Sequence, residues 1–365
     1  MPGSARKRTA PRAPTLSDVG RAAGVSAMAA SAVLNGARTS SRISEETRAK
    51  ILAAAGRLHY RPNAAARALA NRRMHTIGVV ANFVGSEINQ YFLEVFNGIV
   101  QCAAAHRQNT TVFSLSSWRS DADRLPSFCD GRIDGLVLLA PVLSRQAGEA
   151  LPRHVPFVAV HGNTPLPNVT NIESDEETGA YELVRHLTTL GHRRILHYAG
   201  PTGVLGAERR VRGYRRALRD AGVKVDENLI TSGDFTQESA RATLRHWLRR
   251  HRNEPMPQAI FCVNDGAAIG CIELLAEIGF RVPIDVSVAG FDDTMAARTT
   301  IPQLTTVRQP LRAMGERAVE ILLEHIINRH EPSEMPPPPV VFPTELVHRA
   351  SVGKPPPASR LIPAL

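Results

Sequence analysis

Basic side chains that could bind phosphate are concentrated in the first fifth of the chain. Residues 1–73 contain fourteen Lys and Arg side chains against three acidic ones, which gives this segment a net charge of +11. The whole chain carries +10, so residues 74–365 together carry −1. A basic segment of this kind attracts nucleic acid. The charge therefore predicts a polyanion as partner of the N-terminal segment, while a basic face that serves only solubility is the alternative.

Motifs that would indicate an enzyme are missing from the sequence. Gly200, Gly203 and Gly206 follow the spacing G-x-x-G-x-x-G, which differs from the dinucleotide-binding G-x-G-x-x-G, and no phosphate-binding G-x-x-x-x-G-K-S/T segment occurs. His192 and His197 lie in or beside a strand-like run without a nucleophile or carboxylate motif nearby, which favours structural roles. We therefore expect a protein without enzymatic activity and without catalytic residues.

The cysteines and the N-terminus indicate an intracellular protein. The N-terminus has no apolar stretch of secretory length, and no window approaches the ~20 apolar residues of a membrane span. The cysteines lack C-x-x-C spacing and matching His pairs, so we expect small core residues in a reducing compartment. They are Cys102, Cys129, Cys262 and Cys271. We expect a cytoplasmic protein associated with the nucleoid, without a cofactor, a metal site or a membrane contact.

Three short helices are predicted in residues 15–62, after a disordered basic arm in residues 1–14. Thr15 and Asp18 are spaced as a capping box that begins the first helix, and Gly24 permits the left-handed turn that ends it. Ser26 can cap a second helix that runs to about Leu34. Two helices joined by so short a turn make a helix-turn-helix.

A third helix is predicted from Ser44 to about Pro62. The apolar residues expected to face inward are Leu16, Val19 and Ala23 in the first helix, Val25, Ala30, Val33 and Leu34 in the second, and Ile51, Leu52, Ala55 and Leu58 in the third. Residues 63–73 are helix-prone but have little apolar surface, so we expect a hinge helix or linker that becomes ordered only against a partner.

Residues 74–350 alternate between strand-like and helical patterns. The predicted strands cover 76–81, 110–115, 135–139, 157–160, 194–198, 259–263 and 286–289, and the predicted helices 91–105, 179–190, 208–221, 267–278 and 312–327. This alternation predicts parallel sheets covered on both faces, in a series long enough for two lobes. Ligands of such folds bind beyond the carboxyl ends of the strands, here in the crevice between the lobes. The Pro-rich residues 351–365 are expected to be a disordered tail.

Motifs in the same order along the chain resemble those of the LacI/GalR-type repressors. They include Thr15 to Ser26, Ser31 to Asn35, Tyr60 to Asn63, Ile77 to Val79, Tyr91-Phe92, Asp134 to Leu136, Gly191 to Ile195, Asn264-Asp265, Gly290 to Asp293 and Leu304 to Val307. The resemblance extends over residues 15 to about 350. It implies a small all-α helix-turn-helix head and a two-lobed α/β sensor domain of the periplasmic-binding-protein-like type I. The implied function is that of a sequence-specific transcriptional repressor.

The resemblance also implies how the protein binds operator DNA. A homodimer would place its second helices in the major groove and its paired hinge helices in the minor groove of a double-stranded operator. The residues at the family's DNA-contacting positions are Thr15, Leu16, Ser26, Ala27, Met28, Ala29, Ser31, Ala32, Asn35, Tyr60, Asn63, Ala66 and Leu69. Leu69 corresponds to the minor-groove wedge that kinks the duplex, although it could instead pack on its own domain.

The second helix departs from the family pattern in one respect. Its segment from Ala27 to Ala32 has few hydrogen-bonding groups, and Ala32 stands where many relatives carry a long polar or basic side chain. We therefore expect fewer base-specific hydrogen bonds than usual and more specificity from the hinge and from DNA shape.

In the sensor domain the resemblance implies an effector site between the lobes. Its residues would be Asn82, Tyr91, Phe92, Arg210, Phe235, Asn264 and Asp292. An Arg and an Asp together can bind vicinal hydroxyls, and aromatic rings can stack on a sugar or a base, so a carbohydrate is the expected small-molecule effector. Four of these residues have an alternative: Tyr91 and Phe92 could be core residues, Arg210 an exposed helix residue, and Asp292 a turn former.

Two other classes of protein share part of the pattern. A periplasmic sugar-binding protein would have a similar two-lobed core but would need an export signal in place of a basic helix-turn-helix. An architectural DNA binder would explain the basic head but would not need the large sensor-like domain.

Overall fold

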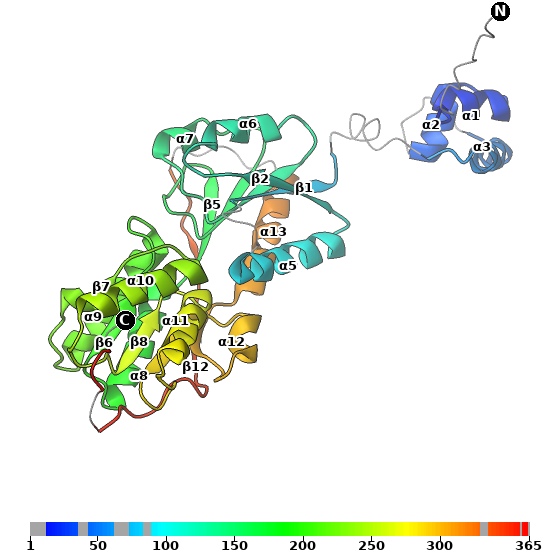
Figure 1. Ribbon diagram of the computed structural model, residues 1–365. Helices are drawn as coiled ribbons and strands as arrows, with labels where there is room; N and C mark the ends of the chain where they lie inside the picture. Colours follow the sequence, from blue (N-terminus) through cyan, green and yellow to red (C-terminus); the bar gives the residue numbers. More distant parts are fainter. Residues whose placement is uncertain are drawn as a thin grey trace, which may run out of the picture. The chain divides into compact units, whose positions relative to one another are not determined.

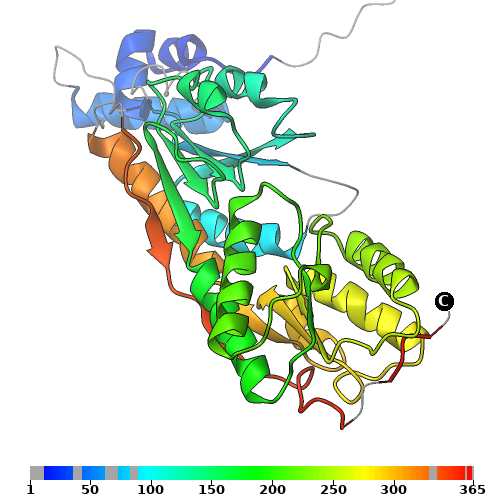
Figure 2. The ribbon, with the colours of Figure 1, turned by 90° about the vertical axis from the view of Figure 1, so that its left-hand side faces the viewer.

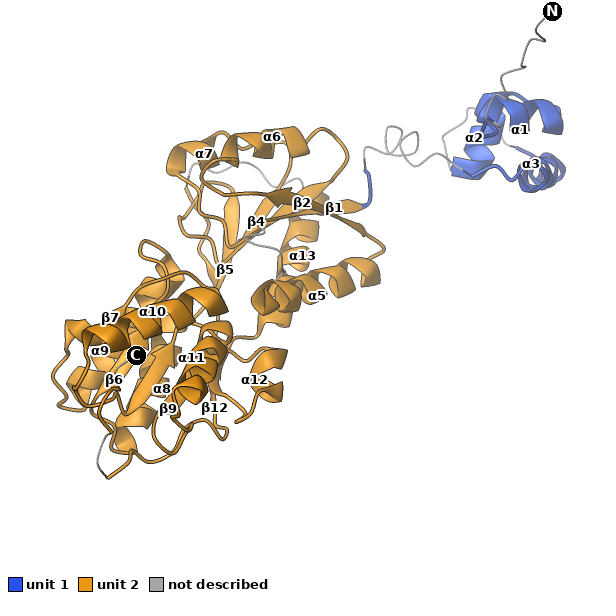
Figure 3. Cartoon of the chain, in the orientation of Figure 1, with its two compact units in different colours: residues 1–75 blue, residues 76–365 orange. Residues whose placement is uncertain are grey.

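The chain divides into two compact units, residues 1–75 (unit 1) and residues 76–365 (unit 2) (Figure 3). The structure is a computed structural model that describes residues 12–35, 43–61, 73–82, 89–328, 335–357 and 360–363. The basic arm predicted in 1–14 and the hinge predicted in 63–73 therefore lie almost entirely outside the described residues. Among the described helices, none combines the length and the apolar character that a membrane crossing requires.

Unit 1 contains the three predicted helices: α1 (Leu16–Ala23), α2 (Ala27–Asn35) and α3 (Glu45–Arg57). The capping box is confirmed, because Thr15 accepts a hydrogen bond from the backbone of Asp18 while the Asp18 carboxylate accepts one from the backbone of Thr15. Gly24 ends α1 with a φ of +70°, a left-handed conformation in which glycine has no Cβ to strain. Ser44 caps α3 as predicted.

The core of unit 1 differs from the predicted one at α3. Val19, Ala30, Ile51 and Ala54 are completely buried. Leu52, predicted to face inward, is 53 % exposed, so this prediction was wrong. Each residue of an α-helix is rotated by about 100° from the one before it, so with Ile51, Ala54 and Ala55 inside, Leu52 falls outside that stripe.

Lobe 1 of unit 2 is built on a six-stranded, entirely parallel sheet with the order β11-β5-β4-β3-β1-β2. Its strands are β1 (Thr76–Asn82), β2 (Asn109–Leu115), β3 (Gly135–Leu139), β4 (Phe157–Val160), β5 (Val169–Ser174) and β11 (Val340–Phe342). Helices α5 (Gln90–Ala105) and α13 (Leu311–Asn328) pack on one face, and α6 (Leu125–Phe128) and α7 (Arg145–Glu149) on the other (Figure 1).

Lobe 2 is built on a second six-stranded sheet with the order β12-β10-β9-β8-β6-β7, parallel except for β12. Its strands are β6 (Ile195–Tyr198), β7 (Ile230–Thr231), β8 (Ala259–Cys262), β9 (Ser287–Asp292), β10 (Thr305–Arg308) and β12 (Glu345–Val347). Helices α8 (Glu176–Thr189) and α9 (Leu205–Asp220) cover one face, and α10 (Gln237–Arg250) and α11 (Asp265–Glu277) the other. The short α12 (Met295–Thr299) follows β9.

The chain passes between the lobes at three places. It crosses from β5 to α8, from β10 to α13, and from β11 to β12. Figure 2 shows β5 and β11 side by side, where they pair as parallel strands at the edge of the lobe 1 sheet before the chain continues to lobe 2. The predicted class of two lobes with parallel sheets is confirmed.

Sequence patterns predicted the strands of high apolar content and missed others. The strands β5, β7, β10, β11 and β12 were not predicted. Threonine, asparagine and glutamate side chains interrupt the apolar runs of β5 and β10, and the other three strands have only two or three residues. The cysteine prediction is confirmed for three of the four: Cys129, Cys262 and Cys271 are buried, while Cys102 is partly exposed.

The predicted disordered tail is wrong for the residues that the structure describes. Ser351 is completely buried and Ile362 is 1 % exposed. The backbone of Met256 donates a hydrogen bond to the Arg360 carbonyl at 2.9 Å, and Ile362 donates one to Glu254 at 2.9 Å. The Pro-rich composition suggested disorder, but apolar side chains spaced along this segment pack on lobe 2 and repay the entropy of ordering it.

Candidate functional site

Helix α2 presents most of the predicted DNA-contacting residues. The Ser26 hydroxyl accepts a hydrogen bond from the backbone N–H of Ala29 at 3.1 Å and so caps the helix. The Met28 side chain is 71 % exposed. Ser31 accepts a hydrogen bond from the amide of Asn35 at 3.2 Å. The helix thus offers an apolar side chain for contact with a thymine methyl, and hydroxyl and amide groups for phosphates or base edges.

The other head residues predicted to contact DNA have structural surroundings of their own. Thr15 belongs to the capping box, and Leu16 and Tyr60 are partly buried against the core of unit 1. Ala27 and Ala32 are partly buried. Three predicted contacts, Asn63, Ala66 and Leu69, lie outside the described residues and stay predictions.

The acidic groups of unit 1 have local partners. The hydroxyl and backbone of Thr15 hydrogen-bond to Asp18 and lower the pKa of that carboxyl. Lys50 lies 2.8 Å from Glu46, and this contact lowers the pKa of the Glu46 carboxyl. Arg61 is exposed. Unit 1 therefore presents a net positive surface on which acidic side chains add little repulsion toward a phosphate backbone.

Arg210 of α9 is buried, which excludes the alternative of an exposed helix residue. Its side chain is 6 % exposed, and its Nη1 donates to the Val263 carbonyl at 2.5 Å. The guanidinium carbon lies 4.0 Å from the centre of the Phe291 ring. Its Nε has no hydrogen-bond partner among the described residues. Because an unpaired buried donor is costly, this group fits an acceptor oxygen of a ligand.

Asp292 ends β9 and is 5 % exposed. Its Oδ1 accepts a hydrogen bond from Gln309 Nε2 at 2.6 Å. Burial raises the pKa of Asp292 to about 6, against the opposing positive charge of Arg210. The backbone φ of Asp292 is +116°, a conformation that costs a non-glycine residue on the order of 1–3 kcal/mol and is typical of functional sites.

Asn264 positions the loop that carries Phe235. As the N-cap of α11, its Oδ1 accepts a hydrogen bond from the backbone of Ala267 at 2.8 Å. Its Nδ2 donates to the Phe235 carbonyl at 3.0 Å, and the Phe235 ring is 38 % exposed. Asn264 follows Val263, whose carbonyl holds Arg210, so one short segment after β8 organises three of the predicted effector residues.

In lobe 1 the predicted residues divide between the cleft and the core. The Tyr91 hydroxyl lies 2.7 Å from His161 Nδ1. Asn82 ends β1, and its buried Oδ1 has no partner among the described residues. Phe92 is 7 % exposed, belongs to the lobe 1 core and stacks with Phe96 at 5.6 Å. Phe92 is therefore a core residue, the alternative that its sequence position left open.

The Tyr91 hydroxyl of lobe 1 lies within reach of charges on lobe 2. Burial raises the pKa of Tyr91 well above its usual value, the charges of Asp292 and Glu176 raise it further, and the charge of Arg210 opposes them. Tyr91, Arg210 and Asp292 therefore come together between the lobes. Their arrangement provides hydrogen-bond donors on Arg210 and an acceptor on Asp292.

Three polar residues at this place were not found by sequence analysis. His161 directly follows β4, Ser174 ends β5 and Gln309 directly follows β10. Their side chains link to one another and to Asp292. The signal that could have found them is position, because the residues at the carboxyl ends of parallel strands line the crevice. The strands β5 and β10 were themselves not predicted, so that signal was missing for Ser174 and Gln309, whereas β4 was predicted and the signal for His161 was present but not used.

A second buried carboxyl, Asp265, lies close enough to Asp292 for their charges to interact. It is 1 % exposed and accepts hydrogen bonds from the Thr294 backbone at 2.7 Å, the Thr294 hydroxyl at 3.0 Å and the Thr306 hydroxyl at 2.6 Å. Burial, and then the charge of Asp292, raise its pKa to about 8. Asp265 thus joins the segment after β9 to strand β10. When Asp265 ionises, the surroundings of Asp292 become more negative.

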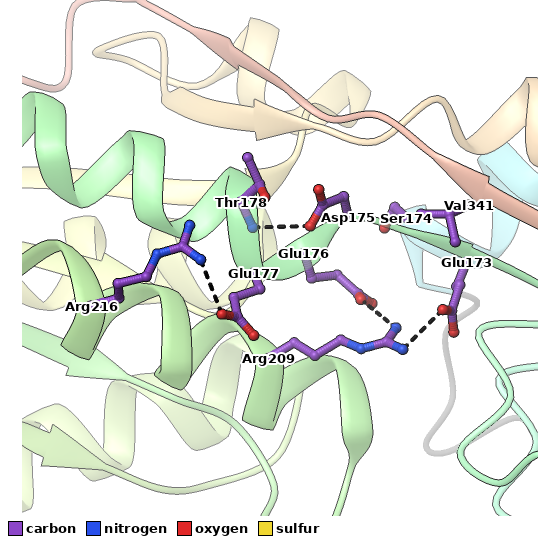
Figure 4. Close-up of a pocket in the computed structure, with 9 residues that line it drawn as sticks. All are labelled: Glu173, Ser174, Asp175, Glu176, Glu177, Thr178, Arg209, Arg216 and Val341. Atoms are coloured by element: carbon purple, nitrogen blue, oxygen red, sulfur yellow. Dashed lines mark hydrogen bonds and ion pairs between the residues drawn. The ribbon is translucent and has the colours of Figure 1, made fainter.

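A pocket of about 330 Å³ opens beside the crossing from β5 to α8 (Figure 4). Arg209 donates to Glu173 at 2.9 Å and to Glu176 at 3.0 Å, and Arg216 donates to Glu177 at 3.2 Å. Both guanidinium groups of the lining are thus paired with carboxylates, so the pocket offers no unpaired cation to an anionic ligand. In the described part of the chain, no three His, Cys, Asp or Glu side chains are arranged to hold a metal ion.

Two family models match the chain, one in each unit. The model of bacterial regulatory proteins of the lacI family matches residues 15–63. The model of the periplasmic binding protein-like domain matches residues 184–352. The first range contains α1, α2 and α3, and the second contains most of lobe 2.

Similar whole proteins include regulators with both units. The HTH-type transcriptional repressor PurR of Vibrio atlanticus is 33 % identical over 346 residues, which are 93 % of this chain and 98 % of that protein. A lac repressor dimer solved bound to operator and the anti-inducer ONPF has a TM-score of 0.78 and 28 % identity, covering 93 % of this chain and 99 % of that one. The transcriptional regulator CelR, solved in complex with cellobiose, has a TM-score of 0.64 and 30 % identity, with the same coverage.

Proposed function

Because this chain belongs to the lacI family of bacterial regulatory proteins, we propose that a small molecule bound between its lobes controls how tightly unit 1 holds DNA. The chain is a DNA-binding transcriptional repressor of that family. The relatives named above are regulators, in keeping with our expectation that it is not an enzyme. A regulator must act where the DNA is, which supports the cytoplasm as its location.

The proposed DNA target is a roughly palindromic duplex, read by α2 in the major groove. The exposed Met28 and the charge of +11 on residues 1–73 support this. Because phosphate contacts release counterions, affinity should fall steeply as salt rises. Random DNA that displaces the preferred site equally well would refute sequence specificity. For Leu69, proposed as the minor-groove wedge, replacement by Ala should cost specific binding on the order of 1–3 kcal/mol and leave random DNA nearly unaffected.

The proposed effector is a neutral carbohydrate. The observation that carries this is the pair formed by Arg210 and Asp292, both of which are buried. Arg210 has an unpaired N–H donor, and the Asp292 carboxylate is an acceptor. Such a pair matches adjacent hydroxyl groups, one accepting and one donating. The exposed ring of Phe235 can cover a sugar face. The complex of CelR with cellobiose, at 30 % identity, supports the same ligand class.

The proposed coupling needs two arrangements of the lobes. A ligand changes DNA affinity only through a difference in its own affinity for the two arrangements. The three crossing segments are the places where one lobe can turn on the other. The experiment below measures whether the effector tightens or loosens DNA binding.

We propose a homodimer that uses one side of unit 2. Apolar side chains that a monomer would leave exposed lie on α5 and around α12, namely Leu93, Val100, Met295 and Ile301, the last with 91 % of its surface exposed. Figure 1 has α5 and α12 on the same side of unit 2. Exposed apolar patches of this kind are typical of subunit interfaces. The lac repressor among the relatives was solved as a dimer.

A thermal-shift screen of neutral sugars, sugar acids and nucleobases tests the proposed function. A compound that binds the native state raises the melting temperature according to its concentration and Kd. The compound that binds should then change the affinity of the full-length protein for its operator. A nucleobase that binds while every sugar fails would replace the carbohydrate by a purine or pyrimidine, and a sugar that binds without changing DNA affinity would refute the coupling.

A further inference from the structure

Five side chains form one continuous hydrogen-bonded chain from lobe 1 to lobe 2. The Tyr91 hydroxyl lies 2.7 Å from His161 Nδ1, and His161 Nε2 lies 3.1 Å from the Ser174 hydroxyl. Ser174 hydrogen-bonds to Gln309 Oε1, and Gln309 Nε2 lies 2.6 Å from Asp292 Oδ1. Ser174 and Gln309 belong to two of the three crossing segments. The two ends of the chain, Tyr91 and Asp292, are residues of the proposed effector cleft.

The direction of every hydrogen bond in this chain follows from its Asp292 end. An ionised carboxylate only accepts, so Gln309 must turn its NH₂ toward Asp292 and its carbonyl oxygen toward Ser174. The single hydroxyl proton of Ser174 is then donated to Gln309. Ser174 can therefore only accept from His161, which requires the proton of a neutral imidazole to be on Nε2. His161 Nδ1 is then an acceptor, and Tyr91 must donate its only proton to it.

The surroundings of the two titratable groups agree with these protonation states at neutral pH. Burial lowers the pKa of His161 to about 4, outweighing the opposing effect of Glu176 and assisted by Arg210 and Arg209. The imidazole is therefore neutral at pH 7. Burial raises the pKa of Asp292 only to about 6, so its carboxylate is ionised at that pH.

We propose that His161 is a positioning residue that makes Tyr91 a pure hydrogen-bond acceptor toward the effector. The inference rests on the proposed function, because it concerns a ligand in the same cleft. With its proton committed to His161, the Tyr91 oxygen can offer a ligand only lone pairs. Asp292 likewise keeps only acceptor sites, since Gln309 donates to its Oδ1. Two acceptors of the cleft thus require two hydroxyl or N–H donors on the ligand, and they repel a carboxylate or phosphate placed between them.

This chain of hydrogen bonds also makes the acceptor role of Tyr91 depend on residues that the ligand does not touch. His161, Ser174 and Gln309 fix the hydrogen-bond direction from Asp292 in lobe 2 to Tyr91 in lobe 1. Ser174 and Gln309 lie on crossing segments. A residue that merely filled space at position 161 would leave the Tyr91 hydroxyl free to rotate and to donate. Position 161 therefore determines which ligands fit, beyond any packing role.

Nitrogen NMR of the full-length protein labelled with ¹⁵N-histidine tests the orientation without any ligand. Other buried histidines supply internal references for both tautomers: His197 Nδ1 faces the Phe261 carbonyl at 3.0 Å, and His192 Nε2 faces the Gly353 carbonyl at 2.9 Å. The signals that disappear in His161→Phe belong to His161. We expect them to show a proton on Nε2 alone at pH 7, as in His192. A proton on Nδ1, or on both nitrogens, would overturn the inference.

Binding of matched compounds tests the consequence for specificity. The probes are cellobiose and ribose, with cellobionate and ribonate as the corresponding acids. The neutral sugar that binds should do so at least tenfold more tightly than its acid. His161→Phe and Tyr91→Phe should each weaken that sugar about tenfold, and the double variant should lose no more than either single variant, because both remove the same acceptor. His197→Phe, which removes a buried histidine that hydrogen-bonds to the Phe261 carbonyl and to none of these five side chains, is the control and should bind normally.

The outcomes separate the inference from the proposed function. An acid that binds as tightly as its sugar, or losses that add in the double variant, would overturn the role of His161. If His161→Phe does not fold, Tyr91→Phe carries the binding test, since it keeps the ring in place. A wild-type protein that none of the four compounds stabilises would refute the proposed carbohydrate class, whereas the NMR result decides the orientation by itself.

Discussion

The side-chain oxygen of Asn163 accepts a hydrogen bond from the backbone N–H of Leu205 at 2.6 Å, although the two residues belong to different lobes. Asn163 lies in the loop after β4 of lobe 1, and Leu205 begins α9 of lobe 2. The Asn163 amide also donates to the Gly203 carbonyl at 3.1 Å. Apart from the crossing segments, this pair of hydrogen bonds joins the lobes directly and holds them in the arrangement described here.

Replacing Asn163 by Ala should let the lobes separate more readily. Two hydrogen bonds at a partly exposed site contribute about 1 kcal/mol. Hydrogen exchange at the Leu205 amide should therefore be about fivefold faster. Asn228→Ala is the control, because the Asn228 side chain donates a hydrogen bond to Asp226 within lobe 2. Unchanged exchange at Leu205 would show that the two hydrogen bonds of Asn163 do not keep the lobes together.

Replacing Met28 by Ala should weaken binding to the preferred DNA site. The loss should be on the order of 1 kcal/mol, because an apolar contact with the major groove is removed, and binding to random DNA should change less than twofold. Leu52→Ala is the matched control, since Leu52 is also exposed in unit 1 but lies on α3. Equal losses from both variants would argue against α2 as the reading helix.

Replacing either Arg210 or Asp292 by Ala should weaken effector binding. The ligand group that each one pairs with would be left unsatisfied in a desolvated cleft, at a cost of roughly 1–3 kcal/mol, or about five- to 150-fold in Kd. DNA binding without effector should change little, because unit 1 is a separate compact unit. Titration of Asp292→Ala with the effector from the screen, followed through DNA binding, measures the shift. An unchanged midpoint would remove Asp292 from the site, and lost DNA binding before any effector is added would indicate a folding role.

Protonation of the unfolded chain at His197 should lower the stability of unit 2 as the pH is lowered from 6.5 to 4. Burial lowers the pKa of His197 from its ordinary value of 6.5 to about 4, so in this range the unfolded chain binds a proton that the folded one does not. The difference corresponds to roughly 3 kcal/mol, present above pH 6.5 and lost by pH 4. His161 acts in the same direction. Asp265 and Asp292 act in the opposite direction, because burial raises their pKa values to about 8 and about 6 and their contributions to stability fall as the pH rises.

Comparison of wild type with His197→Phe isolates the histidine from the carboxyls. Phe can keep the stacking with Phe261, whose ring centre lies 4.3 Å away, but cannot titrate. The measurement is urea unfolding between pH 4 and pH 8. At low pH the variant should lose less unfolding free energy than wild type, because its unfolding takes up about one proton fewer. Parallel pH profiles for the two proteins would contradict the assignment.

Local hydrogen bonds explain why unit 1 could be predicted from its sequence. The capping box of Thr15 and Asp18, the left-handed Gly24 and the caps Ser26 and Ser44 all act within four residues of their partners. Such signals depend on the identity of neighbouring residues and hardly on the rest of the molecule. Even there, the rotation of α3 was predicted wrongly at Leu52, because which side faces the core depends on how α3 packs against α1 and α2.

In unit 2 the sequence by itself determined the alternation of strands and helices, and with it the two parallel sheets, because apolar periodicity reports burial directly. Only the tertiary structure decided which residues meet between the lobes. Tyr91 and Asp292 are about two hundred residues apart, and the three side chains that join them come from the ends of three strands, β4, β5 and β10. That meeting depends on the chain crossing between the lobes three times. No local pattern encodes those crossings, since the strands that lead into two of them, β5 and β10, are rich in polar residues whose partners lie far away in the sequence.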